Sequence, residues 1–170
     1  VITVKYNDDG SIKRVKARIV ACGYSQTPDE YTKIFAATLP GVSARFLLSC
    51  IADEDLETDH IDAVKAFTQA DIDCELYVEM PEGFKIDNYV LLLLKALEGI
   101  RQGAALWFEH NRAALTQCGC SSWINEPNLY IHDTHKFRIG VFADDILSGY
   151  ERQLTNEYKA FKKAYSILIK

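Results

Sequence analysis

Two adjacent carboxylates, Asp144 and Asp145, are the residues of this sequence best suited to chemistry. They lie between an apolar run that ends at Phe142 and a second apolar pair that begins at Ile146. Such runs are typical of strands that bury their side chains. Because a buried unpaired carboxylate is costly, two neighbouring acids cannot both point into a core. We therefore predict that they occupy the tip of a tight strand-turn-strand hairpin.

Paired anions at a strand tip are suited to holding a divalent cation. Mg²⁺ takes oxygen ligands and keeps coordination positions open for substrate phosphates. An ordinary turn is the alternative, since Asp is a common turn residue. Asp62 ends another predicted strand, 56–62, and is either a helix cap or a third carboxylate delivered to the same metal site.

Length and composition indicate one domain with its own core, because the chain has 170 residues of which 48% are hydrophobic. No apolar run is long enough to span a bilayer, and the polar start predicts no signal peptide. Since Val1 is not methionine, we expect an internal cut or a missing upstream part. The five cysteines form no CxxC pair and favour a reducing compartment.

One cluster of potential zinc ligands is present in the sequence. Cys118 and Cys120 precede His132 and His135 at spacings that a zinc site could use. The alternative, which we favour, is a helix that ends near the cysteines, followed by surface histidines.

The net charge of −5 argues against a chain that binds nucleic acid by overall charge. The charges are unevenly spread, however, because acids dominate residues 53–82 while basic residues gather near the start. This asymmetry permits a phosphate-facing patch beside an acidic metal site. The basic cluster consists of Lys5, Lys13, Arg14, Lys16 and Arg18.

The hydrophobic periodicity predicts both helices and strands. A hairpin with a basic face is expected at the start, and a loop follows it at 23–31. Ser43 is a candidate cap for the first helix, and Gly119 is a suitable residue just after the second. The hairpin pairs 1–6 with 12–21; helices are expected at 43–52, 103–118 and 154–168; strands are expected at 56–62, 76–80, 89–94 (buried), 128–132 and 136–142.

Six segments, in order and at fitting spacing, resemble one family: the reverse transcriptase domain of copia-type LTR retrotransposon polyproteins. The resemblance covers nearly the whole chain, with Trp107 at the place of the family's tryptophan. The six are Lys16–Gln26 (KARIVACGYSQ against KARLVAKGYSQ), Tyr31–Ala36 (YTKIFA against YTETFAP), His60–Phe67 (HIDAVKAF against QMDVKTAF), Leu76–Phe84 (LYVEMPEGF against IYMEQPEGF), Leu97–Gln102 (LEGIRQ against LYGLKQ) and Phe142–Asp145 (FADD against YVDD).

This resemblance implies an α+β right-hand polymerase fold with fingers and palm, an antiparallel sheet packed on helices, and no thumb. The chain would be a single partial domain, with a fingers hairpin at about 1–40 and the palm at about 41–170. The implied activity is RNA-directed DNA polymerisation, the addition of deoxynucleotides to a primer on an RNA or DNA template. Partners would include the integrase and RNase H domains of the polyprotein, whose wider function is DNA integration. The implied location is the cytoplasm, in a virus-like particle, or the nucleus, with no membrane.

The resemblance also assigns a metal centre. Asp62 and Asp144 would be the main ligands of two Mg²⁺ or Mn²⁺ ions, and Asp145 would complete the acidic cluster. In a two-metal mechanism the ions lie about 3.5–4 Å apart and hold the attacking and leaving oxygens.

Four further residues match family positions that contact the substrate. Lys16 and Arg18 would bind the triphosphate, as a point charge and a bidentate fork. Phe67 is either an aromatic gate that excludes a 2′-hydroxyl or a core phenylalanine. Gln102 falls where the family packs a residue near the incoming nucleotide and template.

Departures from the family pattern lead us to expect weak or no activity from the isolated chain. The family's lysine is Cys22 here, and its Pro-Arg pair is replaced by Ala104 and Ala105, which removes a basic group. The alternative function is therefore an inactive remnant, a decayed copy that at most binds nucleic acid or protein. A third reading is a two-metal phosphohydrolase, ranked low because no water-activating histidine accompanies the acids in sequence. Further departures are Ala37 for Pro, Glu98 for Tyr and Ala143 for Val.

Overall fold

The computed structural model describes residues 1–169 of the chain. Within that range the chain forms three α-helices, nine β-strands and four short 3-10 helices. The helices are α1 (Gly41–Asp53), α2 (Gly103–Gln117) and α3 (Thr155–Leu168). The strands are β1 (Ile2–Tyr6), β2 (Ile12–Ala17), β3 (Glu57–Asp62), β4 (Tyr77–Val78), β5 (Leu91–Leu92), β6 (Cys120–Trp123), β7 (Glu126–His132), β8 (Arg138–Phe142) and β9 (Asp145–Tyr150). The 3-10 helices are η1 (Gly23–Ser25), η2 (Pro28–Glu30), η3 (Ala66–Gln69) and η4 (Arg152–Leu154).

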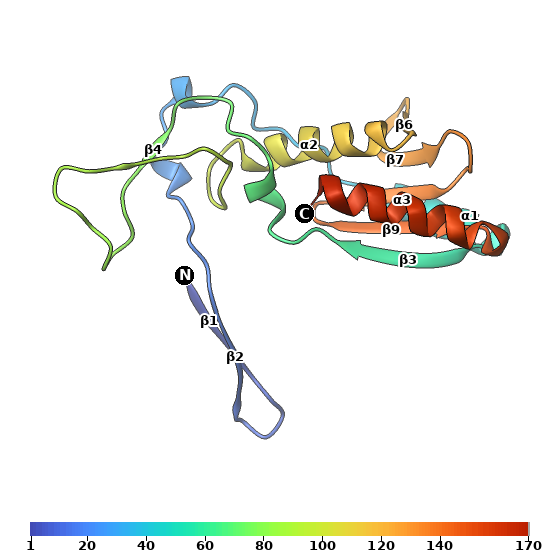
Figure 1. The fold of residues 1–170 in the computed structure, drawn as a ribbon, viewed down its shortest axis with the longest axis horizontal. Coiled ribbons are helices and arrows are strands. Elements are labelled where there is room, and N and C mark those ends of the chain that lie inside the picture. The colour runs from blue at the N-terminus through green and yellow to red at the C-terminus, as the bar shows by residue number, and fades with distance from the viewer. Residues whose placement is uncertain (170) are drawn as a thin grey trace.

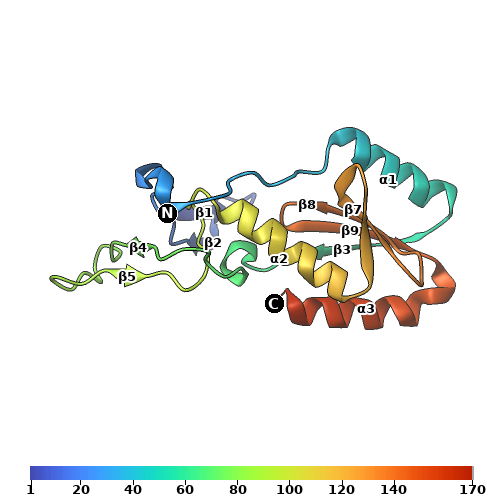
Figure 2. The same cartoon turned by 90° about the horizontal axis from the view of Figure 1, so that it is seen from above.

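An antiparallel five-stranded sheet is the centre of the fold, with strand order β3-β9-β8-β7-β6. Helix α1 covers one face of this sheet, while α2 and α3 cover the other (Figures 1 and 2). On the α2 and α3 side, Trp107, Tyr158 and Phe161 pack with Ile139 and Ile146 in the largest hydrophobic cluster. The predicted antiparallel sheet packed on helices is therefore confirmed.

Helix α1 approaches the sheet closely, and glycines on the strands make that approach possible. A β-carbon at Gly140 would lie 2.5 Å from Cδ2 of Leu47, and one at Gly149 would lie 2.7 Å from Cγ1 of Ile51. Both distances are shorter than normal packing allows. Leu47 and Ile51 are buried here together with Leu129.

The start of α1 corrects one prediction. Ser43 does not cap the helix, because the helix begins at Gly41 with Pro40 at the capping position. Ser43 lies inside the first turn and its hydroxyl donates to Oε2 of Glu126, at 2.8 Å.

The end of α2 agrees with expectation, since Gly119 follows it with a φ of +80°, a conformation that glycine adopts without strain.

The segment between β4 and β5 corrects a second prediction. The sequence predicts a buried strand at 89–94, but only Leu91 and Leu92 are in strand conformation, and they are 40% and 47% exposed. Their partner strand is β4, which also has two residues. Leu93 packs in part against the cluster that contains Leu76 and Ala96, but the other residues of 89–94 are exposed rather than buried.

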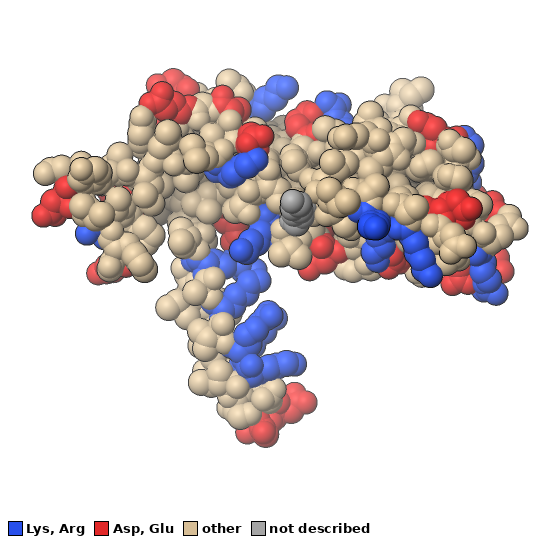
Figure 3. All heavy atoms as spheres, in the orientation of Figure 1, with Lys and Arg blue, Asp and Glu red and all other residues tan. Residues whose placement is uncertain are grey.

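The hairpin β1–β2 is confirmed and extends away from the sheet (Figure 1). Its register pairs Lys5 with Arg14 on one face and Val4 with Val15 on the other. Because side chains alternate along a strand, the hairpin has a basic face and an apolar face. Lys and Arg side chains line one side of the hairpin in Figure 3.

The remaining elements of the main sheet and helix α3 lie close to their predicted positions, apart from β6. Strand β6 was missed by the sequence analysis, whereas β3, β7, β8 and α3 are confirmed within a few residues. No helix in residues 1–169 is long and apolar enough to cross a membrane.

Candidate functional site

The three predicted acids meet at one end of the five-stranded sheet. Asp62 is the last residue of β3 and pairs in register with Asp145, the first residue of β9. Directly opposite residues of an antiparallel pair have Cα atoms about 4.5–5.5 Å apart and side chains on the same face. Asp144 lies in the turn beside them, where its carbonyl accepts from the backbone N–H of Ala63 at 3.0 Å. All three acids are exposed.

The turn that carries Asp144 is fixed by helix α2. Phe142 pairs with Asp145, so the turn consists of residues 143 and 144, as the sequence predicts for a hairpin tip. Ala143 has a φ of +55°, in the left-handed region that costs energy for a residue with a β-carbon. Its carbonyl accepts from the indole Nε1–H of Trp107 at 2.8 Å. Sequence reasoning matched Trp107 to the family's tryptophan and missed this contact, although a buried indole N–H usually requires an acceptor.

A histidine also reaches the acids, which the sequence analysis did not foresee. Nε2 of His60 lies 2.9 Å from Oδ1 of Asp145. The sequence did contain a signal, because His60 precedes Asp62 by two residues in a strand and so shares its face. The phosphohydrolase reading is ranked low in the sequence analysis because no histidine accompanies the acids; the position of His60 shows that this reason is wrong.

The acids supply the donor atoms that a hard cation prefers. Carboxylate oxygens at an exposed strand end fit Mg²⁺ or Mn²⁺, and open solvent leaves room for phosphate ligands. Within residues 1–169, no group of three His, Cys, Asp or Glu side chains is already arranged to hold a metal ion. The backbone brings the three carboxylates together, and a cation would require their side chains to turn toward one another.

The zinc alternative loses support from the environment of its ligands. Burial raises the pKa of the Cys120 thiol to about 12, which disfavours the thiolate that zinc requires. The His132 ring packs against Phe137 and Phe161, and no group of three His, Cys, Asp or Glu side chains in residues 1–169 is arranged to hold a metal ion. The favoured reading, a helix that ends at this point, is confirmed, but His132 is half-buried rather than a surface residue.

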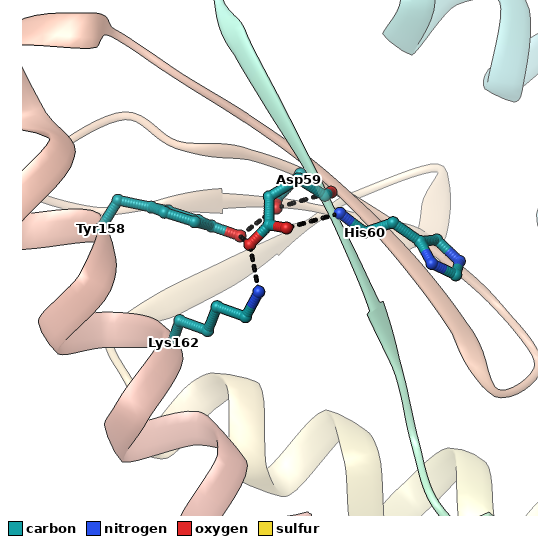
Figure 4. A network of polar contacts seen from close by, with 5 residues as sticks. Asp59, His60, Tyr158 and Lys162 are labelled. Atoms are coloured by element: carbon teal, nitrogen blue, oxygen red, sulfur yellow. Dashed lines mark hydrogen bonds and ion pairs between the residues drawn. The ribbon is translucent and has the colours of Figure 1, made fainter.

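Behind the acids, a polar network fastens β3 to α3 (Figure 4). Asp59 points to the helix side of the sheet, where its Oδ2 accepts from Lys162 and from Tyr158. The hydroxyl of Ser148 donates to the Asp59 backbone carbonyl at 3.2 Å. Asp59 and Asp62 therefore lie on opposite faces of β3. Asp59 anchors the strand to α3, while Asp62 lies on the other face.

The two predicted triphosphate ligands lie on the hairpin and do not contact the acids. Arg18 lies beside Glu98, with Nε 3.6 Å from Oε2. Lys16 belongs to the basic face of β2, opposite Thr3. No hydrogen bond or ion pair in residues 1–169 joins either side chain to Asp62, Asp144 or Asp145.

Gln102 is fully buried, with 0% of its surface exposed. Its Oε1 accepts from Nε2 of Gln26 at 3.0 Å, and its own Nε2 donates to the carbonyl of Glu30 at 3.1 Å. In this conformation protein groups use both ends of the Gln102 amide. Its contact with a nucleotide therefore stays a prediction.

Phe67 lies in η3, partly buried against the largest cluster and close to the start of α2. A β-carbon at Gly103 would lie 3.7 Å from Cδ1 of Phe67. This position is compatible with a core residue and with a gate, so both readings stand.

Two motif glycines explain how the loop after β2 meets the loop before α2. The N–H of Gly23 donates to the carbonyl of Gly99 at 3.1 Å, and a β-carbon at Gly23 would lie 2.0 Å from that oxygen. Gly99 has a φ of +97°. Any side chain at either position would separate the loops, which lie next to the Gln26 and Gln102 pair.

Comparison with known proteins identifies relatives of this chain. The family described as reverse transcriptase (RNA-dependent DNA polymerase) matches residues 1–167. The retrovirus-related Pol polyproteins from transposons RE1 and RE2 of Arabidopsis thaliana are 34% and 33% identical over 154 residues, which is 86% of this chain and 10% of each relative. The Pol polyprotein from transposon TNT 1-94 of Nicotiana tabacum is 34% identical over 112 residues, 64% of this chain and 8% of that relative. No solved structure matches.

The chain spans about a tenth of the length of these polyproteins. The predicted resemblance to the reverse transcriptase domain of retrotransposon polyproteins is confirmed over nearly the whole chain. The chain belongs to the reverse transcriptase (RNA-dependent DNA polymerase) family.

Proposed function

We propose that this chain is the fingers-and-palm part of an RNA-directed DNA polymerase, and that Asp62, Asp144 and Asp145 are its catalytic carboxylates. The observation that carries the proposal is the in-register pairing of Asp62 with Asp145, with Asp144 in the adjoining turn. Three acids distant in sequence meet at one exposed sheet end, and the hairpin of the same chain has a basic face. This arrangement suits a substrate that carries phosphates and metal ions.

Under this proposal the chain has two parts, fingers and palm. The hairpin and its following loops, about 1–40, are the fingers, and the five-stranded sheet with its helices, about 41–170, is the palm. The substrates are a deoxynucleoside triphosphate and a primer annealed to an RNA or DNA template. The remaining partners are the integrase and RNase H domains of a longer polyprotein, and its location is cytoplasmic, in a virus-like particle, or nuclear.

Each site residue then has a chemical role. Bound Mg²⁺ or Mn²⁺ would activate the primer 3′-hydroxyl and neutralise the leaving phosphate. Asp62 and Asp144 would hold the ions and Asp145 would add the third carboxylate. Lys16 and Arg18 contact the triphosphate, which requires Arg18 to leave Glu98.

A second candidate is an inactive remnant that binds nucleic acid or a protein partner. The contact between Arg18 and Glu98 favours it, because the glutamate replaces a family tyrosine and occupies a predicted phosphate ligand. Ala104 and Ala105 also favour the inactive remnant, since they replace a family pair that includes a basic residue. The isolated chain is therefore expected to extend a primer weakly.

Primer extension on an RNA template, with Mg²⁺ or Mn²⁺, tests the proposal. We expect metal-dependent extension by the unmodified chain and its loss in Asp144→Asn. Asp133→Asn is the matched control, because Asp133 is an exposed acid in the turn at the other end of β8. If the folded chain shows neither extension nor metal-dependent nucleotide binding, the catalytic proposal fails and the remnant reading replaces it.

A further inference from the structure

His60 holds a defined place among the three acids. It lies two residues before Asp62 on the same face of β3, and its Nε2 reaches across to Oδ1 of Asp145 on β9, at 2.9 Å. An ionised carboxylate only accepts hydrogen bonds, so Nε2 carries the hydrogen and donates it. Among residues 1–169, His60 is the one side chain that donates a hydrogen bond to any of the three carboxylates.

The contact selects one orientation of the Asp145 carboxylate. Engaging Oδ1 leaves the second oxygen of the same group available to another partner. Both side chains are more than half exposed, at 58% and 56%, so the site is accessible to ions. His60 and Asp145 also border an apolar pocket beneath α1, lined by Leu39, Leu47 and Phe142 among others. The apolar residues on that side offer Asp145 no competing donor.

We propose that His60 is a positioning residue of the nucleotidyl-transfer site, which orients Asp145 so that its free oxygen serves a divalent cation. The inference rests on the proposed function, since it assigns a role beside the proposed metal ligands. Hydrogen-bond partners of metal-binding carboxylates typically contribute about 10- to 100-fold to metal affinity or activity. Because both side chains are partly exposed, we expect the effect of His60 on metal affinity to lie at the lower end of that range.

Mn²⁺ binding to the full chain tests this role without relying on activity. Binding is measured as the decrease of the free Mn²⁺ signal in electron paramagnetic resonance. We expect His60→Ala to weaken Mn²⁺ binding by about tenfold, by loss of the donor. His60→Gln should recover most of the affinity, because an amide N–H can still donate and the related motif QMDVKTAF has glutamine at this position. Thr58→Ala is the matched control, as Thr58 is exposed on the same face of the same strand.

The outcomes separate the inference from the function beneath it. If the unmodified chain binds Mn²⁺ and Asp145→Asn loses it, but His60→Ala binds normally, the positioning role is overturned and the proposed function stands. Equal loss in the Ala and Gln variants also overturns it, because a hydrogen bond would not be the cause. If the unmodified folded chain binds no Mn²⁺, both the proposed function and the role of His60 fail. Circular dichroism melts of each variant show that a loss of binding is not a loss of fold.

Discussion

The indole of Trp107 donates a hydrogen bond to the carbonyl of Ala143, at 2.8 Å, and so joins helix α2 to the turn that carries Asp144. Trp107 is 3% exposed, whereas Ala143 lies at the surface with a φ of +55°. A buried side chain therefore supports an exposed turn in an unfavourable backbone conformation. Such conformations persist where the surrounding structure enforces them, often at functional sites.

We predict that Trp107→Phe destabilises the fold by about 1 kcal/mol through loss of this hydrogen bond, with a further cost from the smaller ring. Urea unfolding measures the change, and primer extension should fall more steeply than stability because the turn loses its support. Trp123→Phe is the control, since Trp123 is 40% exposed at the end of β6. Equal effects in the two variants would contradict a specific role for the Trp107 contact.

The hydrogen bonds that Asp59 of β3 accepts from α3 predict a pH dependence of stability. Burial alone would raise the pKa of Asp59, but hydrogen bonds from Lys162 and Tyr158 outweigh it and place the pKa below the ordinary 3.8. A group whose pKa is lower in the folded than in the unfolded state stabilises the fold above its unfolded pKa. This contribution should therefore be constant near neutral pH and decline as the pH falls below about 4.

Asp59→Asn should remove that acid-sensitive part of the stability and cost about 2 kcal/mol, as for hydrogen bonds to charged groups. Asp62→Asn, three residues along the same strand, should leave stability nearly unchanged because Asp62 is exposed and its side chain is unpaired in residues 1–169. Urea unfolding between pH 3 and pH 7 measures both variants. Parallel stability curves for Asp59→Asn and the unmodified chain would refute the assignment.

The hydrogen bond between the partly buried Gln26 and the buried Gln102 predicts an energetic coupling between the loop after β2 and the start of α2. Gln26→Ala leaves the buried amide oxygen of Gln102 without this partner, which costs about 1–3 kcal/mol, whereas Gln102→Ala frees only the partly buried amide of Gln26. A double-mutant cycle should give a coupling energy of about 1 kcal/mol between the two positions. Additive free energies of unfolding would show that the contact contributes nothing, and would return Gln102 to its predicted role beside the nucleotide.

Sugar selection tests the two readings of Phe67. If the ring is a gate, Phe67→Val should raise the incorporation of ribonucleotides relative to deoxynucleotides in primer extension. If the ring is only part of the core, both substrates should be affected equally. Leu154→Val is a suitable control, because Leu154 also packs at the edge of the largest cluster.

The local features of this protein are largely decided by the sequence. Alternation and turn residues predict the β1–β2 hairpin, and the apolar runs around Asp144 and Asp145 predict a hairpin tip, because these are short-range effects of backbone and side chain. The helical periodicity at 103–118 and Gly119 after it predict α2 almost to the residue. Six ordered motifs identify the family, and the comparisons confirm it.

Contacts between distant segments are decided only by the tertiary structure. That Asp62 pairs with Asp145 rather than a neighbouring residue depends on strand register, which turns and cores set together. The partners of Trp107, His60 and Gln102 lie 36, 85 and 76 positions away, beyond the reach of any local pattern. The exposure of 89–94 was misjudged for the same reason, since a run of leucines records hydrophobicity but not whether another layer covers it.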